Sequence, residues 1–429
     1  MSDLSIIRVH GRRVWDSRGR PTVEAEVTLA DGSTGRAIVP AGASRGTREA
    51  LELRDGGPSF GGLDVLRAVA HVDGEIARGV AGLAADDQAA LDARLVALDG
   101  TPAKSRLGAN ATLAVSMAAA HAAATARGVP LYRHLGGDGA ALMPMPQIQI
   151  FGGGAHAGAR VDIQDFMVVC PGATSFAEAL ERTAEVYRCA GELMHARGSL
   201  GGVADEGGWW PDFATNEQAL QTLVDAIERA GFTPGNEVAI ALDIAASEFG
   251  RGGRYRLALE QREFDADGWI ELLLRWIDAY PIASIEDPLA EDDLRAFARF
   301  TQAAGARLQI VGDDLLVSDA GLVREAAAAG AANCVLLKPN QRGTLSETLD
   351  AWRAARDAGY AGIVSARSGE TEDTTIVHLA IGWQVGQLKV GSFARGERMA
   401  KWNEALRIEE RLGPAARFAG QRAFGRNPG

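Results

Sequence analysis

Two hydrophobic patterns divide the chain. Near the amino terminus, apolar and polar residues alternate along residues 23–29, which is typical of a strand with one buried face. An Asp31-Gly32 pair follows and favours a tight turn. Residues 4–39 therefore predict an antiparallel hairpin, whereas the second half carries short, continuous apolar runs separated by stretches with helical patterns.

Six of these apolar runs end in a polar or charged residue, and the run ends lie roughly 20 to 45 residues apart. Alternating buried strands and helices predict βα units around a parallel sheet. In a barrel of such units, the chemistry lies at the carboxyl ends of the strands. The runs are VAIALD at Asp243, IASIED at Glu286, LQIVGDD at Asp313, CVLLK at Lys338, GIVSARS at Arg367 and Ser368, and GQLKVG at Lys389.

The acidic residues of this set, Asp243, Glu286 and Asp313, are the predicted metal ligands. Carboxylate oxygens from successive strand ends suit the octahedral coordination of Mg²⁺. The alternative for each acid alone is a cap on the following helix. Three in succession, each after a buried strand, favour the metal site.

The basic residues suggest a base and an anion site. A lysine among apolar neighbours and near another cation has a lowered pKa, so Lys338 or Lys389 could act as a base. Salt bridges to the acidic residues are the alternative. Arg367 and Ser368 together offer a guanidinium fork and a hydroxyl to a phosphate or carboxylate.

Three Gly-rich loops supply further candidates. Glu206 lies beside aromatic residues in ADEGGWWPDF, where burial would raise its pKa and make it a proton donor. The alternative is a solvated acid in a turn. His156 lies in GGGAHAG, although a lone histidine is more often structural, and Ser44 lies in VPAGASRGT, a loop that could close over a site.

Length and composition limit the classes of protein. The chain has 429 residues and a formal net charge of -12, which argues against nucleic acid or an anionic membrane as the main partner. Three cysteines without paired spacing and a start without a signal-peptide core predict a cytoplasmic protein.

Helical stretches are expected at 62–81, 84–98 and 110–127, the last capped by Asn110. A Gly- and Pro-rich linker then predicts domains at 1–138 and 139–429.

Long motifs spread over nearly the whole chain resemble the enolase (phosphopyruvate hydratase) family. They are DSRGRPTVEAEV, VPAGASRGTREALELRDGG, RLGANATLAVSMA, HAGARVDIQDFM, ADEGG, ALDIAASEF, YPIASIEDPLAEDD, VGDDLLV, LLKPNQRGTLSETL, RSGETEDTTI and RGERMAKWNEALRIEE. The resemblance implies an N-terminal α+β lid domain on a modified TIM-like (β/α)8 barrel, usually dimeric or a higher homo-oligomer. It also implies an enzyme with two Mg²⁺ ions per site that acts on a small phosphorylated acid.

The resemblance assigns roles by position. Asp243, Glu286 and Asp313 match Mg²⁺ ligands, and Ser44 matches a lid serine that helps to hold the second ion. The remaining matches are Lys338 as the base, Lys389 as the ligand of the substrate carboxylate, Arg367 and Ser368 as phosphate binders, Glu206 as the acid that helps hydroxide to leave, and His156 as a lid-side histidine.

Departures from the family pattern lie on one side of this set. The family's SHRS is SARS here, so Ala366 replaces a histidine, and QEF is QDF, which shortens a catalytic glutamate to Asp165. Arg45 adds a positive charge to the lid, where it is expected to contact substrate. Proton removal would be retained and the leaving-group side rebuilt, as a larger or more anionic substrate would require.

Three functions fit these residues. The favoured hypothesis is a specialised paralogue similar to the carboxyphosphonoenolpyruvate synthases of phosphonate antibiotic biosynthesis. The first alternative is an ordinary glycolytic enolase, which converts 2-phosphoglycerate to phosphoenolpyruvate and water. The second is a binding protein that has kept the fold without catalysis.

Overall fold

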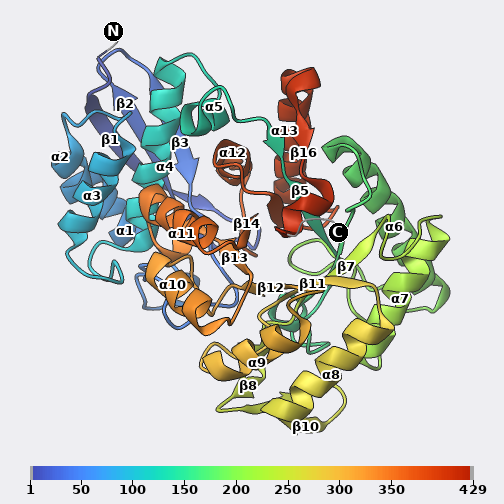
Figure 1. Cartoon of the computed structure of the whole chain (residues 1–429). Coiled ribbons are helices and arrows are strands. Elements are labelled where there is room, and N and C mark those ends of the chain that lie inside the picture. Colours follow the sequence, from blue (N-terminus) through green and yellow to red (C-terminus); the bar gives the residue numbers. More distant parts are fainter. Residues whose placement is uncertain (1–2, 426–429) are drawn as a thin grey trace.

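The computed structural model describes residues 3–425, in which an N-terminal α+β unit lies beside an eight-stranded barrel (Figure 1). The predicted fold class is confirmed. The N-terminal sheet consists of three antiparallel strands in the order β1 (Ile6–Trp15), β2 (Pro21–Leu29) and β3 (Thr34–Ile38). Val23, Ala25, Val27 and Leu29 are all buried, as their alternation predicted.

Helix α4 (Ala109–Ala126) packs against this sheet because its Ala-rich sequence permits a close approach. A Cβ added to Gly35 of β3 would lie 2.1 Å from the Ala122 nitrogen, so only glycine fits there. The other helices of this unit are α1 (Leu66–His71), α2 (Ala77–Val80), α3 (Gln88–Asp99) and α5 (Leu131–Gly136).

The prediction that Asn110 caps α4 is wrong. The helix begins after Gly108, and no side chain caps it. The Asn110 amide instead accepts a hydrogen bond from the Leu53 nitrogen at 3.1 Å and donates one to the Leu53 oxygen at 3.0 Å. The side chain is therefore used by a neighbouring segment rather than by its own helix.

The barrel closes in the strand order β11-β12-β13-β14-β15-β5-β6-β7. Its strands are β5 (Met145–Gly152), β6 (Asp165–Val169), β7 (Ala239–Asp243), β11 (Ile282–Glu286), β12 (Gln309–Gly312), β13 (Cys334–Leu337), β14 (Ala361–Ser365) and β15 (Gln387–Gly391). All six predicted apolar runs form strands of this barrel. These six strands pair in parallel, as predicted. Strand β6 is not one of the six runs, and it is antiparallel to both neighbours. A short segment without an α-helix joins β5 to β6, and parallel strands need a longer crossover.

Helices surround the barrel (Figure 1). Thr344 accepts a hydrogen bond from the Glu347 nitrogen at the start of α11, and Asp319 caps α10 in the same way. The outer helices are α6 (Phe176–Ala196), α7 (Asn216–Arg229), α8 (Ala266–Ala279), α9 (Leu294–Ala304), α10 (Ala320–Ala329), α11 (Leu345–Asp357), α12 (Thr375–Gly382) and α13 (Gly396–Leu412). Short strands complete the chain: β4 (Leu142–Met143), β8 (Gly250–Arg251), β9 (Arg254–Leu257), β10 (Arg262–Asp265) and β16 (Arg417–Phe418).

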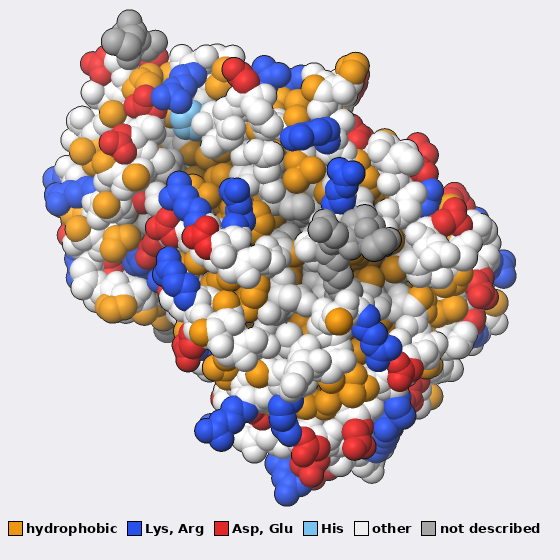
Figure 2. Space-filling view, in the orientation of Figure 1, with side chains coloured by type: hydrophobic (Ala, Val, Ile, Leu, Met, Phe, Trp, Pro, Cys, Tyr) orange, Lys and Arg blue, Asp and Glu red, His pale blue; other side chains and the backbone are white. Residues whose placement is uncertain are grey.

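The surface carries charges of both signs, and Figure 2 shows acidic and basic side chains interspersed over one face. None of the helices within residues 3–425 is long and apolar enough to span a membrane. The three cysteines, Cys170, Cys189 and Cys334, are buried and free.

Candidate active site

The carboxyl ends of the barrel strands bring acidic residues around Lys389. Asp243 and Glu286 end the adjacent strands β7 and β11 and are paired in register. The Lys389 Nζ lies 2.7 Å from Asp243 Oδ2, 2.7 Å from Glu286 Oε2 and 3.5 Å from Asp165 Oδ2. Asp165 reaches this group because β6 runs antiparallel and so begins where β7 ends. The reversed strand therefore adds a carboxylate to the site.

Lys338 forms the second buried ion pair. Its Nζ donates a hydrogen bond to Asp313 Oδ2, and Gln341 Nε2 donates to the other carboxylate oxygen at 2.8 Å. Burial favours the neutral amine and lowers the pKa of Lys338, but the carboxylates around it, Asp313 first and then Glu286, raise it more in sum, so the pKa is raised. The pKa of Lys389 is also raised, because Asp243 and Glu286 outweigh its burial. The predicted lowering of both pKa values is wrong for this arrangement.

The oxygen ligands here fit a hard divalent cation. Asp243, Glu286 and Asp313 are buried, and Glu286 Oε1 has no hydrogen-bond partner within residues 3–425. Burial and the neighbouring Asp243 raise the pKa of Glu286, as expected for crowded acids that need positive charge. The three predicted ligands do not all converge within 4.8 Å in the described structure. The tighter acidic groups are His156–Asp165–Glu206 and Asp287–Asp313–Asp314.

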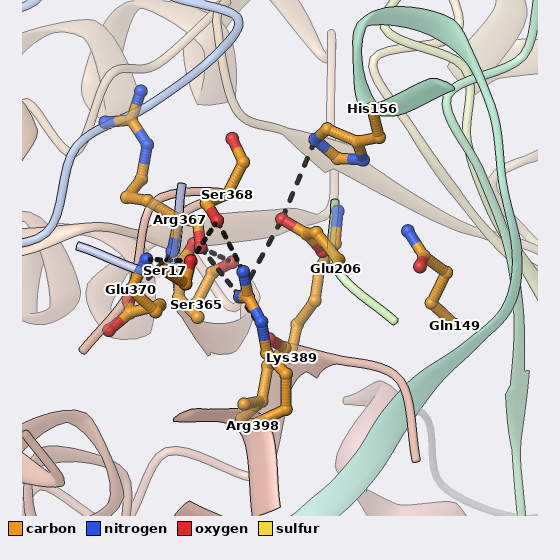
Figure 3. Close-up of polar contacts among 12 residues, drawn as sticks. Ser17, Gln149, His156, Glu206, Ser365, Arg367, Ser368, Glu370, Lys389 and Arg398 are labelled. Atoms are coloured by element: carbon orange, nitrogen blue, oxygen red, sulfur yellow. Dashed lines mark hydrogen bonds and ion pairs between the residues drawn. The ribbon is translucent and has the colours of Figure 1, made fainter. Parts of the chain in front are cut away.

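His156 lies between two carboxylates on the opposite wall. Its Nδ1 is 3.0 Å from Asp165 Oδ1. Its Nε2 is 3.6 Å from Glu206 Oε1, and Figure 3 shows this second contact. Burial alone would lower the pKa of His156, but Glu206 and Asp165 raise it to about 9. His156 is therefore a cation at neutral pH. Gln149 also donates a hydrogen bond to Asp165, so the aspartate is fixed by two side chains.

Arg398 lies on the other side of Glu206, with its Nη1 3.9 Å from Glu206 Oε1 (Figure 3). It is wholly buried on α13 and donates hydrogen bonds to the carbonyl oxygens of Arg367 at 2.7 Å, Val390 at 2.8 Å and Ser368 at 2.5 Å. Arg398 thus fixes the backbone that carries the predicted phosphate binders.

The lid segment, residues 40–49, closes over Arg367 and Ser368. The Ala43 nitrogen donates to Ser368 Oγ at 2.9 Å, and Arg367 Nη2 donates to the Ser44 carbonyl oxygen at 3.0 Å. Arg45 forms an ion pair with Glu52 and keeps a side chain that is 42% exposed. The side chain of Arg45 points toward Glu52, just beyond the lid segment, and the contact of Arg45 with substrate stays a prediction.

A small cavity under the lid collects most of the predicted residues. Arg45, Glu286 and Asp313 are not among the residues that line it. Those that do line it are Ser44, His156, Asp165, Glu206, Asp243, Lys338, Arg367, Ser368 and Lys389, with Ala366 beside them. A larger cavity of about 730 Å³ is lined by the carboxyl-terminal part of the lid segment, at Thr47, together with Arg251 and Leu322 of the barrel unit. We assign the site to the smaller cavity because the buried charges converge there.

Comparison with known proteins agrees with this geometry. The family description "Enolase, N-terminal domain" matches residues 6–135, and "Enolase, C-terminal TIM barrel domain" matches residues 140–427. The chain belongs to the enolase family. A protein named Enolase from Rubrobacter xylanophilus (strain DSM 9941) is 51% identical over 420 residues, which cover 98% of each chain. The enolase-family chain is accordingly an enzyme of the Mg²⁺-dependent lyase class, as predicted.

The same comparison corrects the predicted function. The specialised phosphonate paralogue was favoured on the strength of Ala366 and Asp165. A relative that matches nearly end to end at 51% identity is named simply as an enolase, so the paralogue interpretation is wrong. Ala366 and Asp165 line the same small cavity as His156 and Glu206.

The site also contains polar residues that the sequence analysis missed: Glu49, Gln149, Gln164, Gln341 and Arg398. Gln164 donates a hydrogen bond to Asp243 Oδ2 at 3.1 Å. It directly precedes Asp165, so its position in a motif was an available signal. Arg398 also lies in a quoted motif, RGERMAKWNEALRIEE, but it is about 30 residues from the Arg367 and Ser368 carbonyl groups that it holds, so the motif did not indicate its partners.

Proposed function

We propose that this enolase-family chain dehydrates 2-phosphoglycerate to phosphoenolpyruvate and water. The observation that carries the proposal is the placement of Lys338 and Glu206 in one cavity, together with the cations Lys389 and Arg367. A base and an acid that face one small space can remove a proton and assist a leaving group on the same substrate. The two cations supply partners for a substrate that carries two anionic groups.

In the proposed reaction, Arg367 and Ser368 hold the phosphate and Lys389 holds the carboxylate. Lys338 Nζ accepts the C2 proton, and the electron pair of that C–H bond moves into the substrate carboxylate, which becomes a dianion. This electron pair returns to form the C2–C3 double bond only as the C3–O bond breaks. The C3–O bond then breaks, and hydroxide leaves as water with a proton from Glu206. His156, held by Asp165, lies 3.6 Å from Glu206 and places positive charge beside the departing oxygen.

Asp243, Glu286 and Asp313, with Ser44 from the lid, would hold Mg²⁺, and we propose two ions per site. When bound, Mg²⁺ stabilises the dianion formed on proton loss, and it offsets the acidic charge that now raises the pKa of Lys338. Ammonium groups already balance these carboxylates, which supports a site adapted to positive charge.

Three further assignments belong to the same proposal. We place a domain boundary at 138/139, and we place the enzyme in the cytoplasm. We also propose a homodimer or higher homo-oligomer, supported by exposed apolar side chains on the N-terminal unit: Ile7, Trp15, Leu51, Phe60 and Leu66. Light scattering on the purified protein tests the assembly, and a strictly monomeric mass would contradict it.

A turnover assay on 2-phosphoglycerate with Mg²⁺ tests the function. We expect phosphoenolpyruvate to form at roughly 1–10³ s⁻¹, the range of ordinary enzymes. Proton exchange at C2 without loss of water would contradict the proposal, because Glu206 and His156 would then fail to assist the departure of hydroxide. Absence of both reactions would contradict it as well.

A further inference from the structure

The guanidinium of Arg367 is already engaged by the protein. Its Nη1 donates to Asn340 Oδ1 at 2.9 Å and to Glu49 Oε2 at 3.1 Å. Its Nη2 donates to the Ser44 carbonyl oxygen at 3.0 Å and to Glu49 Oε1 at 3.2 Å. A guanidinium has five N–H groups, and these contacts use four of them. Little donor capacity remains for a phosphate.

The contact between Arg367 and Glu49 is also buried. The side chains of Arg367 and Glu49 are 3% and 8% exposed. The lid backbone lies so close that a Cβ added to Gly42 would be 2.0 Å from Arg367 Nη2. Glu49 and the lid backbone thus occupy the Nη atoms of the guanidinium. An anion must therefore displace a protein group to reach the fork of Arg367.

We propose that Glu49 is an internal competitor for the anion site on Arg367. Its carboxylate accepts hydrogen bonds from both Nη atoms, as a bound phosphate would. Phosphate binding would replace this contact with one of the same geometry. The inference rests on the proposed function, in which Arg367 binds the substrate phosphate.

Glu49 differs from the other partners of Arg367 in its charge. Asn340 and the Ser44 carbonyl are neutral, and they suffice to orient the guanidinium because they hold one hydrogen on each Nη atom. The other hydrogen bonds of Glu49 come from neutral donors, at 3.2 Å from the Gly46 nitrogen and 3.4 Å from Gln341 Nε2. Glu49 is thus held mainly by Arg367 and is free to leave with the lid once displaced.

The competition favours ligands that carry two negative charges. A monoanion such as a carboxylate gains no more from Arg367 than Glu49 already gains. A phosphate dianion carries twice the charge and therefore gains more. Glu49 would exclude compounds that lack a phosphate, at the cost of some affinity for those that have one.

The Glu49→Gln variant tests the inference. Calorimetric titration of the full-length enzyme with inorganic phosphate, in the presence of Mg²⁺, gives the affinity without turnover. Removing the competing charge should tighten phosphate binding by about tenfold or more. Formate, a monoanion, should bind measurably to the variant and far more weakly to the wild type. Glu52→Gln is the matched control, because Glu52 pairs with Arg45 and Arg54 instead, and it should leave phosphate affinity unchanged.

A second variant provides a test that does not depend on whether Glu49→Gln folds. Glu49→Asp retains the charge but shortens its reach, so it should also bind phosphate more tightly, by a smaller factor. Equal or weaker phosphate binding by either folded variant would overturn the inference and show that Glu49 orients Arg367. If the wild type fails to dehydrate 2-phosphoglycerate while Glu49→Gln binds phosphate more tightly, the inference stands and the proposed function fails. If the wild type dehydrates 2-phosphoglycerate normally and neither variant binds phosphate more tightly, the proposed function stands and the inference fails.

Discussion

Two layers of buried polar side chains lie inside the barrel, and they differ in charge. Lys389 at the mouth contacts Asp243 and Glu286. Gln387, two residues earlier on β15 and so on the same side of the strand, belongs to a neutral layer. In that layer Gln387 accepts from Gln147 at 2.9 Å and donates to Gln309 Oε1 at 2.8 Å.

This difference in charge separates a layer that serves the fold from a layer that serves catalysis. The deeper amides donate to and accept from one another, which is the inexpensive way to bury polar groups. The upper layer buries like charges and leaves Glu286 Oε1 without a partner within residues 3–425. Such an arrangement costs stability unless a ligand uses it. Disrupting the upper layer should therefore affect activity, and disrupting the lower layer should affect folding.

Removal of Mg²⁺ should have the largest effect. Excess chelator should abolish conversion of 2-phosphoglycerate, because Asp243, Glu286 and Asp313 lose the cation that they are proposed to hold. The fold should persist, since the neutral layer contains no predicted metal ligand. Activity and circular dichroism measured on one sample check both points. Full activity in chelator would contradict the metal assignment, and added Mg²⁺ should restore the rate.

Lys338→Ala should lower the turnover rate by about 10²- to 10⁴-fold, the usual contribution of a positioned base. It should also abolish exchange of the C2 proton in heavy water. Lys338→Arg is the control, because arginine keeps the charge beside Asp313 but cannot accept the proton. Normal exchange in either variant would assign the base to another residue.

His156 should make stability depend on pH. Its pKa of about 9 in the folded protein lies above the usual value near 6.5, owing to Glu206 and Asp165. Its stabilising contribution is therefore complete below about pH 6.5 and is lost as pH rises through 9. The free energy of unfolding should fall by about 3 kcal/mol over that range.

Urea titrations at several pH values measure the slope of the free energy of unfolding against pH. It should be much smaller in His156→Gln. The matched control is His195→Gln, since His195 is an exposed histidine at the end of α6. An unchanged slope in His156→Gln would show that the histidine is neutral in the folded protein.

Gln387→Leu in the lower layer should have the smallest effect on turnover. It leaves the amides of Gln147 and Gln309 without their shared partner, which costs about 1–3 kcal/mol of stability. The rate per folded molecule should stay close to that of the wild type. Gln302→Leu on the exposed face of α9 is the control. A large loss of rate with unchanged stability would remove the distinction between the layers.

Much of the barrel could be predicted from the sequence, but two strands could not. The six apolar runs were recognisable because strands buried on both faces are continuously apolar. Strand β5 includes Gln147 and Gln149, which are fully buried but interrupt the apolar run. The reversal of β6 depends on the missing crossover helix, which is a property of chain connection rather than of the strand itself.

The residues of the candidate site also fall into those that the sequence indicated and those that it did not. The residues that end strands were predicted by position, because several charged residues in succession after buried runs favoured a shared site over separate helix caps. The pairing of Arg45 with Glu52 could not be predicted because neighbouring lid residues point in different directions, and Glu49 was missed although it lies four positions further on. The loss of a histidine at Ala366 was visible, but its effect on function was judged wrongly.

The sequence by itself determined the strand ends and the kinds of charge that meet there, because apolar periodicity and residue type are local properties. Only the tertiary structure decided which charges pair. Arg367 contacts Glu49 across 318 positions of the chain, and Lys338 has a raised pKa because Asp313 lies beside it. Hydrogen bonds and Coulomb interactions act over a few ångströms in space, so their partners are set by the folding of distant segments onto one another.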